Sequence, residues 1–181
     1  MEVLFKSLNI AGGSYLFEKA VIEDTSAEII IRSKSEVEIQ IFGGGAHAGR
    51  RVDIQDFLVM CPAATSFAEA LDWTAEVYRA AGAIMKQRGL LQGVADEGGW
   101  WPAFTANEQA LETLVAAIEK AGFAPGRQVA IALDIAATDF GKGGRYKLGL
   151  EGRELGTDEM IRMLLGWIGR ASCRERVLRL V

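Results

Sequence analysis

Residues 38–60 read EIQIFGGGAHAGRRVDIQDFLVM, and this stretch decides the fold. Polar and apolar residues alternate over 38–42, which is typical of a strand with one buried face. Three glycines over 43–45 then predict a loop. Residues 56–60 form a second short apolar run that we expect to be a strand. Two strands joined by a glycine-rich loop therefore begin the readable part of the chain.

Two helices are predicted after these strands. Ser66, with Glu69 three residues later, is typical of a capping box, and apolar residues at helical spacing continue to Gly89. Glycine commonly ends a helix because it adopts the left-handed conformation without strain. Thr105 and Glu108 repeat the capping pattern before a second run of apolar residues at helical spacing.

The remaining elements complete an α/β order. An apolar strand is expected over 129–133 and ends at Asp134, a small hairpin over 146–155, and a third helix capped by Thr157. The order is strand, strand, helix, helix, strand, helix, which predicts a parallel sheet covered by helices. A closed eight-stranded α/β barrel takes ~250 residues, so a chain of 181 residues cannot form one.

Composition narrows the class of protein. The 181 residues are 50% hydrophobic and carry a net charge of −4, so the charge gives no support for nucleic-acid binding. No apolar run approaches the ~18 residues that span a bilayer. The first 30 residues lack the basic-then-apolar order of a signal peptide. Two cysteines make no disulfide framework. We therefore expect a soluble, cytoplasmic protein.

His47, the sole histidine, lies in the glycine-rich loop. A histidine there would offer a switchable hydrogen-bond donor beside a bound substrate. Asp53, Gln55 and Asp56 follow, and strand alternation would put Asp53 and Gln55 on one face and Asp56 on the other. On the pattern alone, a surface loop for His47 and a polar strand edge for residues 53–56 are favoured over a functional site, and both interpretations stay open.

Two further acidic positions are candidates for chemistry. Asp96 and Glu97 precede two glycines, and a carboxyl group held beside apolar rings can serve as a general acid. Asp134 ends an apolar strand, where a charge is costly unless it is paired or bound to a cation such as Mg²⁺. An acidic turn and a helix cap are the structural alternatives.

Taken together, these segments resemble the enolase family (phosphopyruvate hydratases) over residues 38–168. The motifs that carry the resemblance are GGAHA at 44–48, DIQDF at 53–57, DEGG at 96–99, Asn107-Glu108, and LDIAA at 133–137. The resemblance implies a partial enolase-type α/β barrel, with the order strand-strand-helix-helix-strand-helix, that is truncated before closure.

The resemblance also implies a reaction, a cofactor and roles for residues. The family reversibly dehydrates 2-phospho-D-glycerate to phosphoenolpyruvate in glycolysis, with Mg²⁺ as cofactor and a homodimer as the intact enzyme. Glu97 would be the catalytic acid that helps the C3 hydroxyl leave as water, and Asp134 would be one of three carboxylate ligands of the tighter Mg²⁺. His47, Gln55 and Asp56 would line the substrate pocket, Asp56 standing where the family usually has the longer glutamate.

The ends of the chain fall outside the resemblance. Residues 1–37 are unassigned, with one candidate strand over 27–32. Residues 168–177 resemble a translated sequencing adapter, so we expect 169–181 to be a non-native tail. The family's base lysine and two further metal carboxylates would lie beyond the end of this chain. We therefore expect no turnover of substrate by this polypeptide alone.

Two alternatives to an enolase stay open. The chain would act as a non-catalytic acidic module if it associated with other proteins through open sheet edges. Titration with Mg²⁺ would discriminate, because a working enolase site binds Mg²⁺ and tightens with substrate. A different enzyme of the enolase superfamily would fit the barrel but not the motifs at 96–99 and His47 together.

Overall fold

A computed structural model describes residues 38–170 continuously and, outside them, the backbone of five short strands. The chain divides into two compact units, Met1–Val37 and Glu38–Val181. The first unit contains two antiparallel pairs, β1 (Glu2–Val3) with β4 (Ala20–Val21) and β2 (Leu8–Ile10) with β3 (Gly13–Tyr15). The strand expected over 27–32 lies outside the described residues, as do 171–177 and 180–181 of the expected tail.

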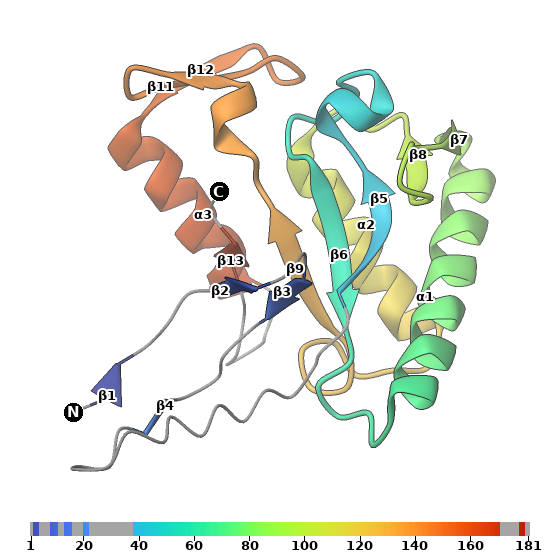
Figure 1. The fold of residues 1–181 in the computed structure, drawn as a ribbon. Coiled ribbons are helices and arrows are strands. Elements are labelled where there is room, and N and C mark those ends of the chain that lie inside the picture. The colour runs from blue at the N-terminus through green and yellow to red at the C-terminus, as the bar shows by residue number, and fades with distance from the viewer. Residues whose placement is uncertain are drawn as a thin grey trace. The chain divides into compact units, whose positions relative to one another are not determined.

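The second unit is built on a six-stranded sheet with the strand order β13-β9-β6-β5-β8-β7 (Figure 1). Its strands are β5 (Ile39–Gly43), β6 (Asp56–Met60), β7 (Leu91–Val94), β8 (Trp100–Pro102), β9 (Ala130–Asp134) and β13 (Leu178–Arg179). The strands predicted over 38–42, 56–60 and 129–133 are therefore confirmed, within one residue at each end.

The prediction of a parallel sheet is wrong for the central strands. β5 pairs antiparallel with β6, and β6 pairs antiparallel with β9. Only β5 with β8 and β9 with β13 are parallel. A parallel neighbour needs a long crossover, usually a helix. The loop between β5 and β6 contains only the one-turn helix η1 (Gly45–Ala48), so β6 runs back along β5.

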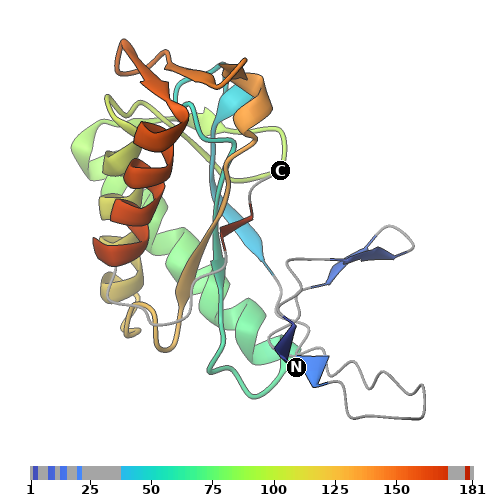
Figure 2. The ribbon, with the colours of Figure 1, turned by 90° about the vertical axis from the view of Figure 1, so that its left-hand side faces the viewer.

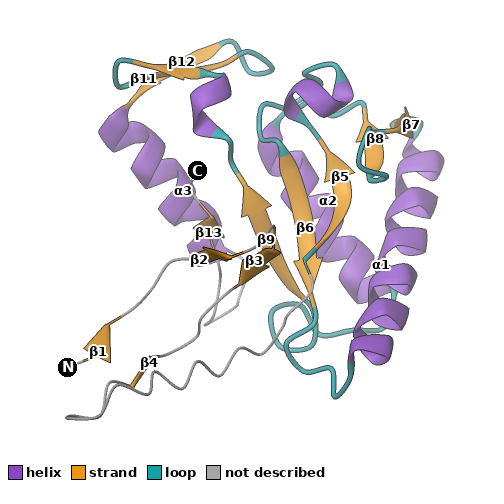
Figure 3. Cartoon of the chain, viewed as in Figure 1, coloured by secondary structure: helices purple, strands orange, loops and turns teal. Residues whose placement is uncertain are grey.

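Three helices accompany the sheet (Figure 3). They are α1 (Phe67–Arg88), α2 (Asn107–Lys120) and α3 (Thr157–Arg170). Figure 2 shows α2 and α3 on the same side of the sheet. No helix in the described part of the chain is both long and apolar enough to span a bilayer.

The core lies between the helices and the sheet. Its largest fully buried side chains come from both layers and include Phe42, Phe57, Phe104, Ile54 and Leu114. Phe42 and Phe104 pack edge to face with ring centroids 5.4 Å apart. Full burial of each such side chain contributes about 1.5–3 kcal/mol, so this contact fixes β5 against the segment that leads into α2.

The predicted cap of α1 is confirmed in part. The Ser66 hydroxyl accepts a hydrogen bond from the Glu69 N–H, and Gly89 ends the helix in the left-handed conformation. The Glu69 carboxylate, however, accepts from the N–H and hydroxyl of Thr65, at 2.6 Å each. In a capping box the Glu69 carboxylate would accept from the N–H of Ser66, and here it accepts from Thr65, one residue earlier.

The predicted cap of α2 is wrong. Ala106 occupies the N-cap position and makes no side-chain capping bond. The Thr105 N–H instead donates to the Gln109 side chain at 3.0 Å. The side chain that bonds back to Thr105 is therefore Gln109, four residues later, and not Glu108 as predicted. The helix begins at Asn107, one residue later than a cap at Thr105 would give.

Loops gather at one end of the six-stranded sheet. A three-stranded antiparallel sheet formed by β10 (Gly141–Lys142), β11 (Arg145–Leu148) and β12 (Arg153–Gly156) confirms the predicted hairpin. This sheet, η1 and η2 (Ala137–Asp139) lie beyond the same end of β5, β6 and β9 (Figure 1). The candidate site is at this end.

Candidate active site

The ends of three strands bring the candidate residues together. Gly43, the last residue of β5, is paired with Asp56, the first residue of β6, and Asp56 is paired with Asp134, the last residue of β9. Residues directly opposite in an antiparallel pair share a face of the sheet. Asp56 and Asp134 therefore lie side by side, although 78 positions separate them in the sequence.

The environments of these two carboxylates differ. Asp56 is 5% exposed, and its carboxylate accepts hydrogen bonds from the side-chain amides of Gln40 and Gln55. Asp134 is partly exposed, and its carboxylate accepts from the Ala136 N–H at 3.1 Å. Ala136 has a φ of 44°, a left-handed conformation that is uncommon for a residue with a side chain and that tends to occur at functional sites. The loop after β9 thus presents Asp134 at the surface.

Glu97 joins this group through Gln40. It lies on the turn between β7 and β8, and its carboxylate accepts from the Gln40 side-chain amide at 3.3 Å. The same amide group donates to Asp56. The structure therefore connects Asp56 and Glu97 through one glutamine that the sequence analysis did not single out.

Gln55 is not on the face predicted for it. Its amide donates to the Asp56 carboxylate at 3.2 Å, so the two side chains meet instead of lying on opposite faces. Residues 51–55 form a bend, and the strand begins only at Asp56. The alternation that holds within strands does not extend into this bend.

The backbone of His47 lies in η1, and its side chain is outside the described part of the structure. The Gly44 N–H donates to the Gln55 carbonyl at 2.7 Å, and the Gly45 N–H donates to the Val52 carbonyl at 2.8 Å. A Cβ on Gly44 would lie 2.0 Å from the Ile54 carbonyl oxygen. The glycine at 44 is therefore required by the packing of the loop itself.

Asp53 has a structural role. Its carboxylate accepts from the N–H of Gly149 at 2.7 Å and from the Asn107 side chain at 2.9 Å. Asn107 is completely buried and also donates to Glu151 at 3.0 Å. These bonds tie the bend before β6, the start of α2 and the turn between β11 and β12 to one another.

The turn that carries Glu97 is supported from α1. The Tyr78 hydroxyl donates to the Gly98 carbonyl at 2.8 Å, and its ring stacks on Trp100 with centroids 4.5 Å apart. The Trp100 indole N–H donates to the Tyr78 carbonyl at 2.8 Å. Burial raises the pKa of Tyr78, which favours the neutral hydroxyl that makes this bond.

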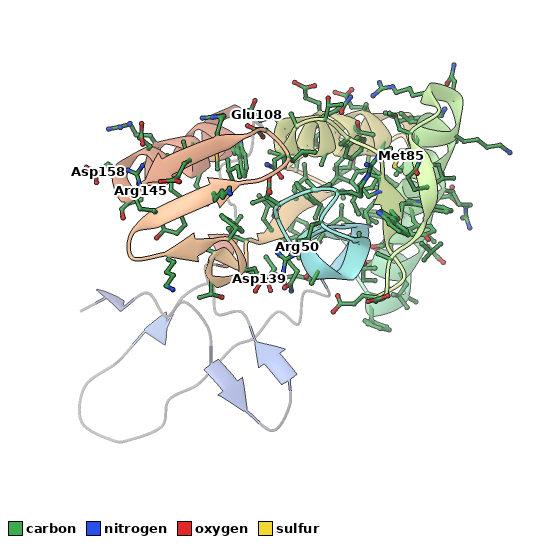
Figure 4. The ribbon with its side chains drawn as sticks, turned by 90° about the horizontal axis from the view of Figure 1, so that it is seen from above. Arg50, Met85, Glu108, Asp139, Arg145 and Asp158 are labelled. Atoms are coloured by element: carbon green, nitrogen blue, oxygen red, sulfur yellow. The ribbon has the colours of Figure 1, made fainter. Side chains whose placement is uncertain are left out.

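The described side chains offer an oxygen donor that could take part in holding a metal ion. Among the described side chains, which do not include that of His47, no three or more cysteine, aspartate or glutamate residues are placed to hold a metal ion together. The partly exposed Asp134 carboxylate provides oxygen donors of the type that Mg²⁺ prefers, whereas both carboxylate oxygens of Asp56 already accept hydrogen bonds from Gln40 and Gln55. Because Mg²⁺ commonly takes one or two protein carboxylates with substrate and waters, the chemistry of Asp134 is compatible with such a site. Figure 4 looks down on this end of the molecule, with Arg50 after η1 and Asp139 in η2 labelled.

Comparison with known proteins identifies the family. A family model described as "Enolase, C-terminal TIM barrel domain" matches residues 37–164. Enolase 1 from Desulfitobacterium hafniense (strain Y51) is 46% identical over 133 residues, which are 72% of this chain and 30% of that protein. The chain thus spans less than a third of the length of this relative. The resemblance seen in the motifs is confirmed, and the chain belongs to the enolase family, where it matches part of the C-terminal barrel domain.

Proposed function

We propose that this chain supplies part of the active site of an enzyme that reversibly dehydrates 2-phospho-D-glycerate to phosphoenolpyruvate in glycolysis. The observation that carries the proposal is the gathering of Asp56, Glu97 and Asp134 at one end of the sheet. These residues come from three separate segments, which the pairing of β8 with β5, β5 with β6 and β6 with β9 brings together.

The proposed roles follow from position and chemistry. Glu97 is exposed, so its carboxyl group is accessible to a substrate, and as the catalytic acid it would give a proton to the departing C3 hydroxyl. Asp134 would hold Mg²⁺, since it lies at the strand end with its carboxylate partly exposed. Bound Mg²⁺ would supply positive charge against the negative charge that develops on the substrate carboxylate.

The residues around these groups would contact substrate. Gln55 and Asp56 are hydrogen-bonded to each other and would form one wall of the pocket. His47 would contribute from η1, the loop that follows β5. Asp56 would act in the network of substrate and water that surrounds Glu97, to which it is joined through Gln40.

The proposal is tested by grafting residues 37–164 into Enolase 1 of D. hafniense in place of the matching segment. We expect the resulting enzyme to form phosphoenolpyruvate from 2-phosphoglycerate only when Mg²⁺ is present. A folded graft without turnover, beside an active parent enzyme measured under the same conditions, would contradict the proposal.

A second candidate function is a non-catalytic interaction module. It is favoured by Ile161 and Leu165, which lie one turn apart on α3 and are 49% and 59% exposed. Titration of the graft with Mg²⁺, with and without substrate, separates the two functions. Tighter Mg²⁺ binding in the presence of substrate supports the enzyme, whereas no Mg²⁺ binding under either condition supports the interaction module.

The wider biological setting is also a proposal. Family membership supports a cytoplasmic enzyme that acts on the small molecules 2-phosphoglycerate and phosphoenolpyruvate and assembles as a homodimer. Size-exclusion chromatography of the active graft tests the dimer. The net charge of −4 gives no support for nucleic acid as a partner.

A further inference from the structure

We propose that Gln40 is a positioning residue that holds the carboxylates of Glu97 and Asp56 in the arrangement the reaction needs. The inference rests on the proposed function and adds to it a residue that contacts neither substrate nor metal in that account. It starts from a polar side chain on β5 that is only 7% exposed and that joins three segments of the chain.

Both ends of the Gln40 side-chain amide are hydrogen-bonded. Its Oε1 atom accepts from the Gly99 N–H at 2.8 Å, and its Nε2 atom donates to Asp56 and, at 3.3 Å, to Glu97. A buried polar group without partners is costly, and here the acceptor and both donor hydrogens have partners. The amide therefore adds no unsatisfied polar group to the core.

The orientation of this amide follows from the chemistry of its partners. A backbone N–H only donates, so the oxygen must face Gly99. With the oxygen on Gly99, the NH₂ group faces Asp56 and Glu97, and a carboxyl oxygen of each accepts a hydrogen bond from it. In this orientation the NH₂ group bridges the two acidic side chains through its hydrogen bonds. Neither glutamate nor methionine, which have similar length, offers an acceptor on one side and two donors on the other.

The surrounding backbone leaves room for this amide. A Cβ on Gly99 would lie 2.5 Å from the Gln40 oxygen, closer than real contacts of this kind. A Cβ on Gly43 would lie 3.3 Å from the same oxygen and 2.4 Å from the Ala95 side chain. The second glycine of the motif at 96–99 is therefore needed to let Gln40 approach the turn that carries Glu97.

A positioning role predicts a specific kinetic change. Misplacement of a catalytic group by about 1 Å can cost about 100-fold in rate. In the enzyme that carries residues 37–164, we expect Gln40→Glu and Gln40→Met to lower kcat about 10- to 100-fold while KM for 2-phosphoglycerate changes less than about threefold. Gln87→Glu and Gln87→Met, on an exposed residue of α1, are the matched controls and should leave both constants unchanged.

A second measurement uses the full 181-residue chain and does not depend on activity. We expect NMR to show a scalar coupling across the hydrogen bond from the Gly99 nitrogen to the Gln40 side-chain carbonyl. We also expect the Gln40 carboxamide protons to exchange with water more slowly than those of Gln87. Gln40 protons that exchange as fast as those of Gln87 would overturn the inference, since the amide would then not be held.

The kinetic outcomes separate this inference from the proposed function. An active graft whose Gln40 variants fold and keep the kcat of the parent overturns the positioning role and leaves the proposed function standing. A folded graft without activity when Gln40 is intact overturns the proposed function, and the positioning role with it. An active graft with the expected loss of kcat supports both.

Discussion

At the residue scale, Asn107 joins three segments that surround the site. Its side-chain oxygen accepts from the Asp53 N–H at 2.9 Å, and its side-chain nitrogen donates to the carboxylates of Asp53 and Glu151. Asn107 is completely buried, so its loss would leave several partners without hydrogen bonds in the interior.

We expect Asn107→Ala to lower the free energy of unfolding by about 3 kcal/mol, because it leaves buried donors and acceptors without hydrogen-bond partners. Urea unfolding followed by circular dichroism measures the change. Gln87→Ala, which removes a side chain from an exposed position of α1, is the control and should change stability by less than about 0.5 kcal/mol. Equal effects of the two substitutions would show that the Asn107 network contributes nothing.

The sequence predicted the candidate carboxylates but not the residues that hold them. Asp134 and Glu97 stand out because a charge at a strand end, or beside two glycines, is a local pattern. Gln40 has partners 16 and 59 positions away, so no local pattern marks it. Asn107 belongs to a quoted motif, but its partners lie 44 and 54 positions away, so its role in holding the site is not visible in the sequence. Asp53 looked like a site residue for the same reason, since its backbone N–H partners at 149 and 150 become visible only in the fold.

At the element scale, α1 supports the turn between β7 and β8 through Tyr78. The hydroxyl of Tyr78 donates to Gly98 while its ring stacks on Trp100, so the turn is fixed at two points. The adjacent Glu97 is positioned in part by this contact between a helix and a turn.

We expect Tyr78→Phe to lower the free energy of unfolding by about 1 kcal/mol at neutral pH, since it removes the hydrogen bond and keeps the stacked ring. Burial raises the pKa of Tyr78 above its ordinary value near 10. The contribution of the neutral hydroxyl is therefore present below about pH 10 and is lost as the pH rises through the raised pKa. A stability difference between the two proteins that stays constant up to high pH would contradict this.

The first turn of α1 has the opposite pH dependence. The Thr65 hydroxyl, and then the Thr65 N–H, lower the pKa of Glu69 from its ordinary value near 4.5. We expect the stability difference between the native chain and Glu69→Gln to be constant above about pH 5 and to shrink as the pH falls through the lowered pKa. Chemical unfolding at several pH values between 3 and 7 measures it. A difference that grows on acidification would show that the Thr65 contacts do not act on the ionised carboxylate.

Elements with strong periodicity were predictable, and their pairing was not. The apolar spacing and end signals of α1 gave its bounds, because helix caps and periodicity are local. β7 and β8 were not predicted, since they are short and their pairing register shifts between Leu91 and Gly93. The antiparallel direction of β6 depends on the loop that contains η1, which the alternation of residues does not encode.

At the scale of the whole molecule, the chain provides one portion of a barrel domain. It matches 30% of the length of Enolase 1, and its described residues form an open sheet with two edges. Asp134 is one carboxylate, and we expect one carboxylate to hold Mg²⁺ only weakly in the isolated chain.

We therefore expect the isolated 181-residue chain to give no detectable conversion of 2-phosphoglycerate, even with Mg²⁺ in excess. A continuous assay of phosphoenolpyruvate formation measures this, with intact Enolase 1 of D. hafniense as the positive control. Turnover by the isolated chain would show that the residues within it are sufficient for the reaction.

The most direct test of the whole account compares two neighbouring carboxylates in the enzyme that carries residues 37–164. General acid catalysis typically contributes about 100- to 10,000-fold to a rate. If Glu97 is the catalytic acid, Glu97→Gln lowers kcat by an amount in that range, while Asp96→Asn, the same chemical change on the adjacent exposed residue, lowers it less than about threefold. Equal kcat values for Glu97→Gln and the parent enzyme would contradict the account.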